Sequence, residues 1–285
     1  MPLPSLIEVA KGLTVSRLPL GAGEKKIKNL ELSTRNQLQS IITVTNNQII
    51  RYVRNRSVQF KKVLTPEDVD TADVDAILSA SAAASRGVMF EEIPVVYYKG
   101  KQTAALSLNT RPMFDLPADV TAIANLKRRT GYYAGELISS RYGNKVKNIL
   151  VDGYTSATPI GEMIRDLRNA ASLTKNDATR LVRTEFVRAS NLGVLQSYTD
   201  NGVKYIEWVT TGDNRVCPIC EMLALSSPHR LKDAEQFPTS HPNCRCTQLA
   251  YFGKEKTSGK MRQIIREPVS GRTKKAREIL KGLKE

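Results

Sequence analysis

The sequence lacks several features that define whole classes of protein. Its 285 residues contain no apolar run of about 18 residues, so we expect no membrane-spanning helix. The first residues, Met1-Pro2-Leu3-Pro4, are not a basic stretch followed by an apolar run, and we expect no secretory signal. Only two histidines are present, which leaves little material for a Ser-His-Asp site or a two-histidine catalytic metal site. With 41% hydrophobic residues and 17 glycines, the chain is neither wholly disordered nor collagen-like.

Acidic residues are scarce relative to basic ones. The chain has 43 Lys and Arg against 28 Asp and Glu, a formal net charge of +15. This excess favours a polyanionic partner, either nucleic acid or an acidic protein surface, and a soluble protein that is simply basic is the alternative. Nearly half of the excess lies in residues 254–285, where 11 basic residues oppose 4 acidic ones. We predict that this tail contacts DNA or a protein partner through Lys254, Lys256, Lys260, Arg262, Arg266, Arg272, Lys274, Lys275 and Arg277.

The spacing of apolar residues in the first half of the chain predicts helices. Residues 35–64 favour one or two helices with a basic outer face. The sequence Thr65-Pro66-Glu67-Asp68 is typical of a helix start, and an Ala-rich helix is expected to continue to Gly87. Residues 91–116 contain prolines and a Val-Val-Tyr-Tyr stretch, which predicts a loop with a short strand or hairpin.

Helical spacing returns at residues 119–141 and is followed by a turn-rich connection, 148–161. A helix is expected from Ile160 to about Ser172. Thr174 with Asp177 three residues later then predicts a new helix start that resembles a capping box.

The alternation of apolar and polar residues in 203–209 predicts a strand after that last helix. The fold class is therefore mainly α with a small mixed α/β lobe, a helical body plus a C-terminal lobe that zinc would cross-link. The expected segments are a basic N-terminal helical arm (1–65), a helical body (66–175), a domain with a Cys/His cluster (176–253) and a basic flexible tail (254–285).

All four cysteines lie close together, and this cluster carries the chemistry. Cys217-Pro218-Ile219-Cys220 is followed, after 20 residues, by His241-Pro242-Asn243-Cys244-Arg245-Cys246. A Cys-x-x-Cys turn directs two thiolates at one centre, and the second turn supplies further donors. Tetrahedral zinc takes four such nitrogen or sulfur ligands, so we predict a zinc site.

Five donors compete for four positions: Cys217, Cys220, His241, Cys244 and Cys246. The sequence favours Cys217 and Cys220 with His241 and one of the last two cysteines, and an all-cysteine set is the other option. Two disulfides, or four unpaired thiols, are the alternatives to a metal. A closed site of this kind leaves no position for a water molecule, so we expect a structural role and no enzymatic activity.

Several separate motifs resemble the Mu F-like head morphogenesis family, the minor capsid proteins of tailed bacteriophages. They are Arg183-Thr184-Glu185, Ala189-Ser190-Asn191, Gly202, Trp208, the run from Gly212 to Cys220 and the run from His241 to Cys246. The resemblance covers about residues 155–250, is weaker over 118–155 and has no motif match before that. It is strongest at the cysteine cluster.

The resemblance implies a low-copy virion protein without catalytic activity, located in the head interior or at the portal vertex and in the host cytoplasm during assembly. Such a protein associates with the portal protein in procapsid assembly, with the major capsid or scaffolding protein as further candidate partners. It would aid DNA packaging or ejection through non-specific contact with double-stranded DNA.

Two alternatives come from other functional classes. A DNA-binding regulator with a zinc module would read bases, whereas a head protein would bind DNA without sequence preference. A nuclease would need His229 together with His241, and we expect His229 to lie in a surface loop. Finally, we predict that Glu185 pairs with Arg215 and fixes the long helix against the Cys-rich lobe.

Overall fold

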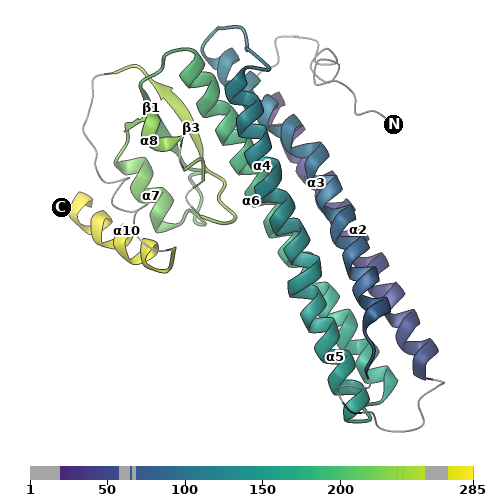
Figure 1. Cartoon of the computed structure of the whole chain (residues 1–285). Helices are drawn as coiled ribbons and strands as arrows, with labels where there is room; N and C mark the ends of the chain where they lie inside the picture. The colour runs from purple at the N-terminus through teal and green to yellow at the C-terminus, as the bar shows by residue number, and fades with distance from the viewer. Residues whose placement is uncertain are drawn as a thin grey trace. The chain divides into compact units, whose positions relative to one another are not determined.

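The computed structural model describes residues 20–57, 65, 69–235, 237–239, 241–253 and 269–284, and these are mostly helical (Figure 1). The helices are α2 (Leu20–Ser57), α3 (Ala72–Ser107), α4 (Pro117–Glu136), the π-helical η2 (Leu137–Tyr142), α5 (Gly143–Thr155), α6 (Ile160–Asp200), α7 (Pro218–Leu225), α8 (Leu231–Ala234) and α10 (Val269–Lys284). The strands are β1 (Tyr205–Val209), β2 (His229–Arg230) and β3 (Thr247–Tyr251). The predicted fold class is confirmed. None of the described helices is both long and apolar enough to cross a membrane.

The predicted loop or hairpin over 91–116 is wrong for residues 91–107, because α3 continues to Ser107 with Pro94 inside it, whereas residues 108–116 form a loop as predicted. Proline removes one helical hydrogen bond and disfavours a helix interior. Here the residues around Pro94 are buried: Ile93, Val96 and Tyr97 each have 0% exposure. Tertiary burial therefore outweighs the local preference of the proline and of the β-branched residues.

The turn-rich connection predicted for 148–161 is also largely wrong, since α5 extends to Thr155 and α6 begins at Ile160. No new helix starts at Thr174. Its hydroxyl donates to the carbonyl of Ala170 at 2.8 Å, four residues back within α6, and the side chain is buried. A threonine that bonds to its own helix in this way does not serve as an N-cap.

The helix start predicted at Thr65 lies largely outside the described residues. The helix that follows, α3, begins at Ala72, where the Asp70 carboxylate accepts a hydrogen bond from the backbone N–H of Ala72 at 2.9 Å. Acidic residues in its first turn, Asp73 and Asp75, complement the positive end of the helix dipole.

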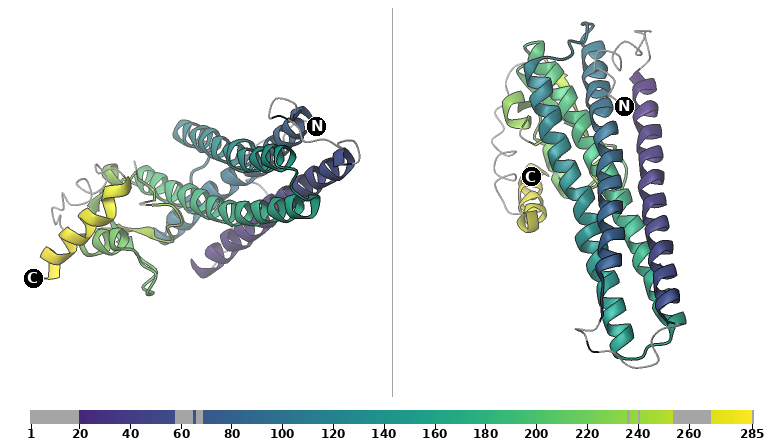
Figure 2. Two further views of the ribbon diagram at one scale, coloured as in Figure 1. Left: turned by 90° about the horizontal axis from the view of Figure 1, so that it is seen from below. Right: turned by 45° about the vertical axis from the view of Figure 1, so that its right-hand side comes forward.

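The chain packs as two compact units, one of residues 1–29, 93–126 and 183–285 (unit 1) and one of residues 30–92 and 127–182 (unit 2). This grouping follows packing and does not test the four sequential segments expected from the sequence. In unit 2 long helical segments lie side by side (Figure 2, right) around buried aliphatic residues. Two buried polar pairs lie inside it: Thr45 donates to Ser81 at 2.7 Å, and the Tyr142 hydroxyl donates to Asn46 at 2.9 Å.

Unit 1 contains the three-stranded antiparallel sheet, in the order β2-β1-β3. The predicted strand is confirmed as β1, whose Ile206 and Trp208 face the core while its other residues are half-buried. Tyr198 of α6 and Leu223 of α7 belong to the same core. Helix α10 packs on α7 (Figure 1, yellow) through Ala276 and Leu280, which are buried.

A buried charge network joins the helices of unit 1. The ammonium of Lys101 lies 2.6 and 2.7 Å from the two carboxylate oxygens of Asp119 and 2.7 Å from Asp200. The hydroxyl of Tyr97 also donates to Asp119, at 2.7 Å, and burial raises the pKa of this tyrosine far above its usual value. Paired and hydrogen-bonded charges of this kind can be buried, whereas a single one could not.

Close backbone contact brings α3 and α6 together near this network. A Cβ atom added to Gly193 would lie 2.0 Å from the carbonyl oxygen of Tyr97, and one added to Gly100 would lie 2.1 Å from that of Ser190. Glycine is therefore the residue type that permits this crossing. The crossing places the last turns of α6 against the side chains of α3, and these turns lead directly into β1.

Candidate metal centre

The first half of the cysteine cluster is the N-terminus of α7. Cys217 is the N-cap residue, with extended backbone, and Pro218 occupies the first helical turn. The Cys217 sulfur accepts a hydrogen bond from the backbone N–H of Cys220 at 3.4 Å. The helix dipole and this N–H donor favour a thiolate at this position.

The second half is the turn that precedes β3. Asn243 has a φ of 62°, a left-handed conformation that asparagine tolerates better than most residues, and this reverses the chain between His241 and Cys244. His241 lies with its Nε2 atom 3.3 Å from the Cys220 sulfur. Its other ring nitrogen, Nδ1, is 2.7 Å from the carbonyl oxygen of Pro242. A proton on Nδ1 would donate to that carbonyl, so that the Nε2 lone pair is left for a metal.

The donor atoms form two groups that share one residue. The ligand atoms of Cys217, Cys220 and His241 lie within 4.8 Å of one another, as do those of Cys220, Cys244 and Cys246. The sulfurs of Cys220 and Cys244 are 3.7 Å apart. Two sulfur ligands on a tetrahedral zinc with bonds of about 2.3 Å would lie about 3.8 Å apart. The residues therefore fit a metal ion, and Cys220 belongs to both groups of donors.

The four cysteines are free thiols in this structure. The 3.7 Å between the Cys220 and Cys244 sulfurs is far longer than the 2.05 Å or so of a disulfide bond. The geometry thus supports metal binding over the disulfide alternative.

The electrostatics of the cluster also favour a cation. A hydrogen bond with Cys220 lowers the pKa of the Cys217 thiol to about 4, and the corresponding bond lowers the pKa of Cys244. The same contacts raise the pKa of Cys220, and a hydrogen bond with Cys217 raises the pKa of His241 to about 10. The contacts therefore favour the thiolate form of Cys217 and Cys244, whereas the pKa values of Cys220, Cys246 and His241 are raised. A divalent cation would displace the remaining protons and neutralise the thiolate charge.

Side chains of α6 hold the second turn in place. The Thr184 hydroxyl accepts a hydrogen bond from the backbone N–H of Asn243 at 2.8 Å, and Arg183 donates to the Asn243 side chain at 3.4 Å. The buried amide of Asn191 donates to the carbonyls of Pro238 at 2.8 Å and Cys246 at 2.9 Å. These α6 residues belong to the motifs noted in the sequence, but nothing in those motifs indicates that they support the metal loop.

An ion pair holds the loop before α7 against the same turn. The guanidinium of Arg245 donates to both oxygens of Asp213, each at 2.7 Å, and Arg215 donates to Asp213 at 3.2 Å. The Arg245 hydrogen bond is the main reason that the pKa of Asp213 lies well below its usual value.

Glu185 lies 3.7 Å from Arg188, one turn along α6. Glu185 thus contacts Arg188, and Arg215 contacts Asp213. The pairing of Glu185 with Arg215 stays a prediction.

His229 is not in a surface loop as expected. It lies in β2 with 2% of its surface exposed, and its Nε2 is 2.7 Å from the carbonyl oxygen of Leu223. Burial lowers its pKa and keeps the ring neutral. A buried histidine that bonds to the backbone of the core is poorly placed to act as the base of a nuclease.

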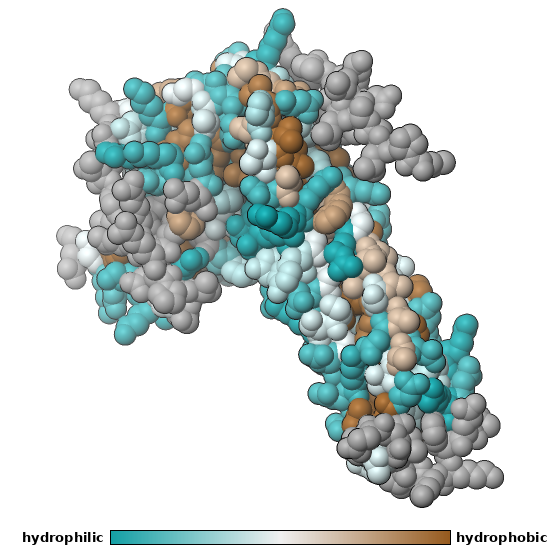
Figure 3. Space-filling view, in the orientation of Figure 1, coloured by the Kyte–Doolittle hydropathy of each residue, from teal (hydrophilic) through white to brown (hydrophobic). Residues whose placement is uncertain are grey.

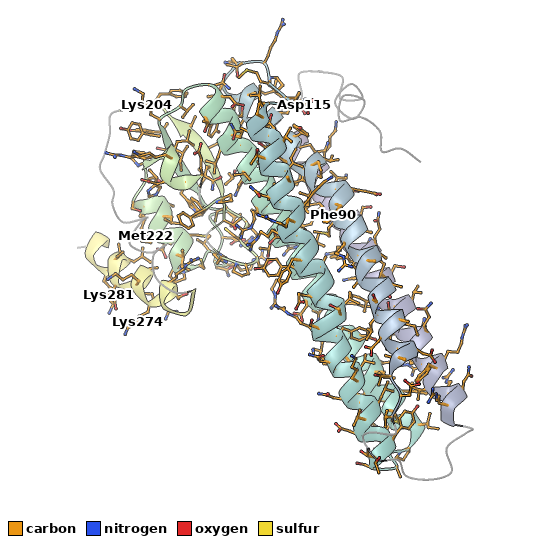
Figure 4. All side chains as sticks on the ribbon, viewed as in Figure 1. Phe90, Asp115, Lys204, Met222, Lys274 and Lys281 are labelled. Carbon is orange, nitrogen blue, oxygen red and sulfur yellow. The ribbon has the colours of Figure 1, made fainter. Side chains whose placement is uncertain are left out.

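The predicted contact residues of the basic tail divide into two groups. Those from Lys254 to Arg266 lie outside the described residues. Arg272, Lys274, Lys275 and Arg277 lie on α10, where Lys274 and Arg277 are exposed and Lys275 is 3.8 Å from Glu278. Figure 4 shows Lys274 and Lys281 on the side of α10 that faces away from α7.

Comparison with known proteins identifies the segment that carries this centre. Residues 144–249 match the family described as Phage Mu protein F like protein. The match includes the whole of α6, β1, β2 and α7, the first three residues of β3 and every candidate metal ligand. Neither a curated protein nor a solved structure gives a significant match to the chain.

The support from α6 predicts the effect of one nearly isosteric change. Thr184→Val removes the hydroxyl that accepts from the backbone N–H of Asn243, and the loss of this part-buried hydrogen bond costs about 0.5–1.5 kcal/mol. We expect the unfolding free energy to fall by that amount and the amide of Asn243 to exchange faster with deuterium. Thr121→Val is the control, because Thr121 is exposed and its hydroxyl donates only to its own helix. Equal effects of the two changes would contradict the role given to Thr184.

Proposed function

Because residues 144–249 form a Phage Mu protein F-like domain, we propose that the chain is a minor head protein of a tailed bacteriophage that acts in head morphogenesis. It is present in few copies in the virion and associates with the portal protein during procapsid assembly, with the major capsid or scaffolding protein as further partners. The observation that carries this proposal is the family match, which covers the complete Cys/His centre.

The centre supports a structural role more than a catalytic one. Its sulfur donors Cys220, Cys244 and Cys246 are at most 5% exposed, and five protein donors compete for the ion. Four-coordinate zinc bound in this way has no open position for substrate or water. Thiolate and imidazole ligands also suit zinc better than magnesium or calcium. We therefore assign the centre to one structural zinc ion.

Zinc binding has a direct test. Native mass spectrometry of the purified chain should show one zinc per chain, and denaturation should release it with four free thiols. Cys220→Ser should abolish zinc binding and expose the 205–251 region to protease, because Cys220 belongs to both donor groups. Cys244→Ser and Cys246→Ser, compared side by side, identify the fourth ligand as the one whose loss lowers the zinc content, and a loss with both changes indicates the all-cysteine set. A metal-free chain with two disulfides would overturn the assignment.

Association with the portal is the second test. When the chain is produced together with the portal protein of the same phage, we expect the two to elute as one complex in size-exclusion chromatography with light scattering. Zinc removal by Cys220→Ser should weaken this complex if the portal contacts the metal-containing lobe. If the correctly folded chain elutes only as the free species, at low and at moderate salt, this result would contradict portal association.

The outer face of α10 supports a second role, non-specific contact with packaged DNA. Each phosphate neutralised on duplex DNA contributes about −0.9 to the slope of log K against log salt. Replacing Arg272, Lys274, Lys275 and Arg277 together by Gln should therefore reduce that slope by about 3 to 4, equally for unrelated sequences. An unchanged slope would exclude α10 from the contact. A marked preference for one sequence would favour the DNA-binding regulator instead.

A further inference from the structure

The outer face of the small sheet carries half-buried tyrosines and an exposed leucine. Tyr205 of β1 pairs with Tyr251 of β3 on one side and with Arg230 of β2 on the other. Glu207 pairs with Leu249, which is 45% exposed. Directly opposed residues of neighbouring strands share one face of a sheet. These five residues therefore lie together, opposite to the core residues Ile206 and Trp208.

A cleft continues this face at the end where β1 begins. It has a volume of about 450 Å³ and is lined by Thr199, Gly202, Val203, Lys204, Tyr205, Arg230, Leu231, Lys232 and Glu235. Tyr205 and Arg230 belong both to the cleft and to the outer sheet face. The cleft and the face are thus one continuous surface, which we call the sheet cleft. Figure 3 shows brown apolar patches among teal polar ones on the lobe that holds it.

The charge of the sheet cleft is mainly positive. Lys204, Arg230 and Lys232 are exposed cations, and Figure 4 labels Lys204 at the sheet. The acidic lining residue, Glu235, accepts a hydrogen bond from the hydroxyl of Thr199. Val203 and Leu231 are buried and form an apolar floor. Cations around an apolar floor are complementary to a polypeptide that combines carboxylates with an apolar anchor.

The residue types also favour a polypeptide over a nucleic acid. Tyrosine and arginine are enriched at the centres of protein interfaces. Leu249 and Val209 add aliphatic surface, which contributes little to a nucleic acid contact. A second copy of this chain is disfavoured as the partner because each copy carries a net charge of +15.

We propose that the sheet cleft is a docking site for an acidic segment of a partner protein, with an apolar side chain of that segment on Val203 and Leu231. This goes beyond the proposed head function, because it names the surface of this chain and the chemical class of its partner. The site is formed entirely by unit 1.

The first experiment measures binding of a fluorescein-labelled peptide of alternating Leu and Glu to the full chain by anisotropy. Lys204→Gln with Lys232→Gln removes two charges from the cleft, and Lys274→Gln with Arg277→Gln removes two from α10. We expect the cleft pair to weaken binding at least tenfold and the α10 pair to weaken it less than threefold. A similar loss in both would mean attraction by net charge alone and would overturn the proposal.

Two further probes test the chemistry of the partner. A peptide of Glu alone should bind less tightly than the Leu-Glu peptide, because it lacks the apolar anchor, and a Leu-Lys peptide should not bind. A single-stranded oligonucleotide that bound more tightly than the Leu-Glu peptide, with the same dependence on Lys204 and Lys232, would instead identify a nucleic acid site. None of these results depends on portal binding, so failure of the head function and failure of the docking site are distinguishable.

Discussion

The C-terminal lobe depends on the convergence of two turns of the chain at the sulfur atom of Cys220. The helix α7 brings this atom within 3.3 Å of His241 and 3.7 Å of Cys244, both of which belong to the turn before β3. The sheet contains only two five-residue strands and one two-residue strand, and α7 has eight residues. Elements as short as these are not stable alone, and metal binding would contribute directly to the folding free energy of the lobe.

The long helices are positioned by a different interaction. Lys101 faces the carboxylates of Asp119 and Asp200, and these three residues come from α3, α4 and the end of α6. A buried ion pair often adds little net stability compared with an apolar replacement, but removing one partner costs about 3–5 kcal/mol. We interpret the network as fixing the position of the last turns of α6 relative to α3 and α4. These turns carry Thr184 and Asn191 towards the metal loop on the same side of the helix as the sheet.

The sequence predicted what depends on local patterns. The alternation around Trp208 predicted β1, and the spacing of Cys217, Cys220 and His241 predicted a candidate metal centre, because in each case neighbouring residues determine the geometry. The helix through Pro94 could not be predicted in this way, since it depends on the burial of Tyr97 against residues distant in the chain. The same holds for the support of the metal loop, where Arg245 meets Asp213 across 32 residues. The prediction that His229 lies in a surface loop was wrong for the same reason. Its proline and arginine neighbours are typical of a surface loop, although the ring is in the core.

The period of two along a strand links the metal centre to the proposed docking site. Strand β3 begins one residue after Cys246, so the residues that alternate along it face either the core or solvent. Gln248 is buried and pairs with Trp208, which belongs to the same core cluster as Cys244 and Cys246. Leu249, the next residue, faces outward opposite Glu207. If a change in the metal loop shifted the pairing of β3 with β1 by one residue, the two faces of β3 would be exchanged. Leu249 would then lie in the core and Gln248 in the sheet cleft. The ion that fixes the loop would therefore also fix which side chains a partner meets, even though no ligand atom lies on the outer face.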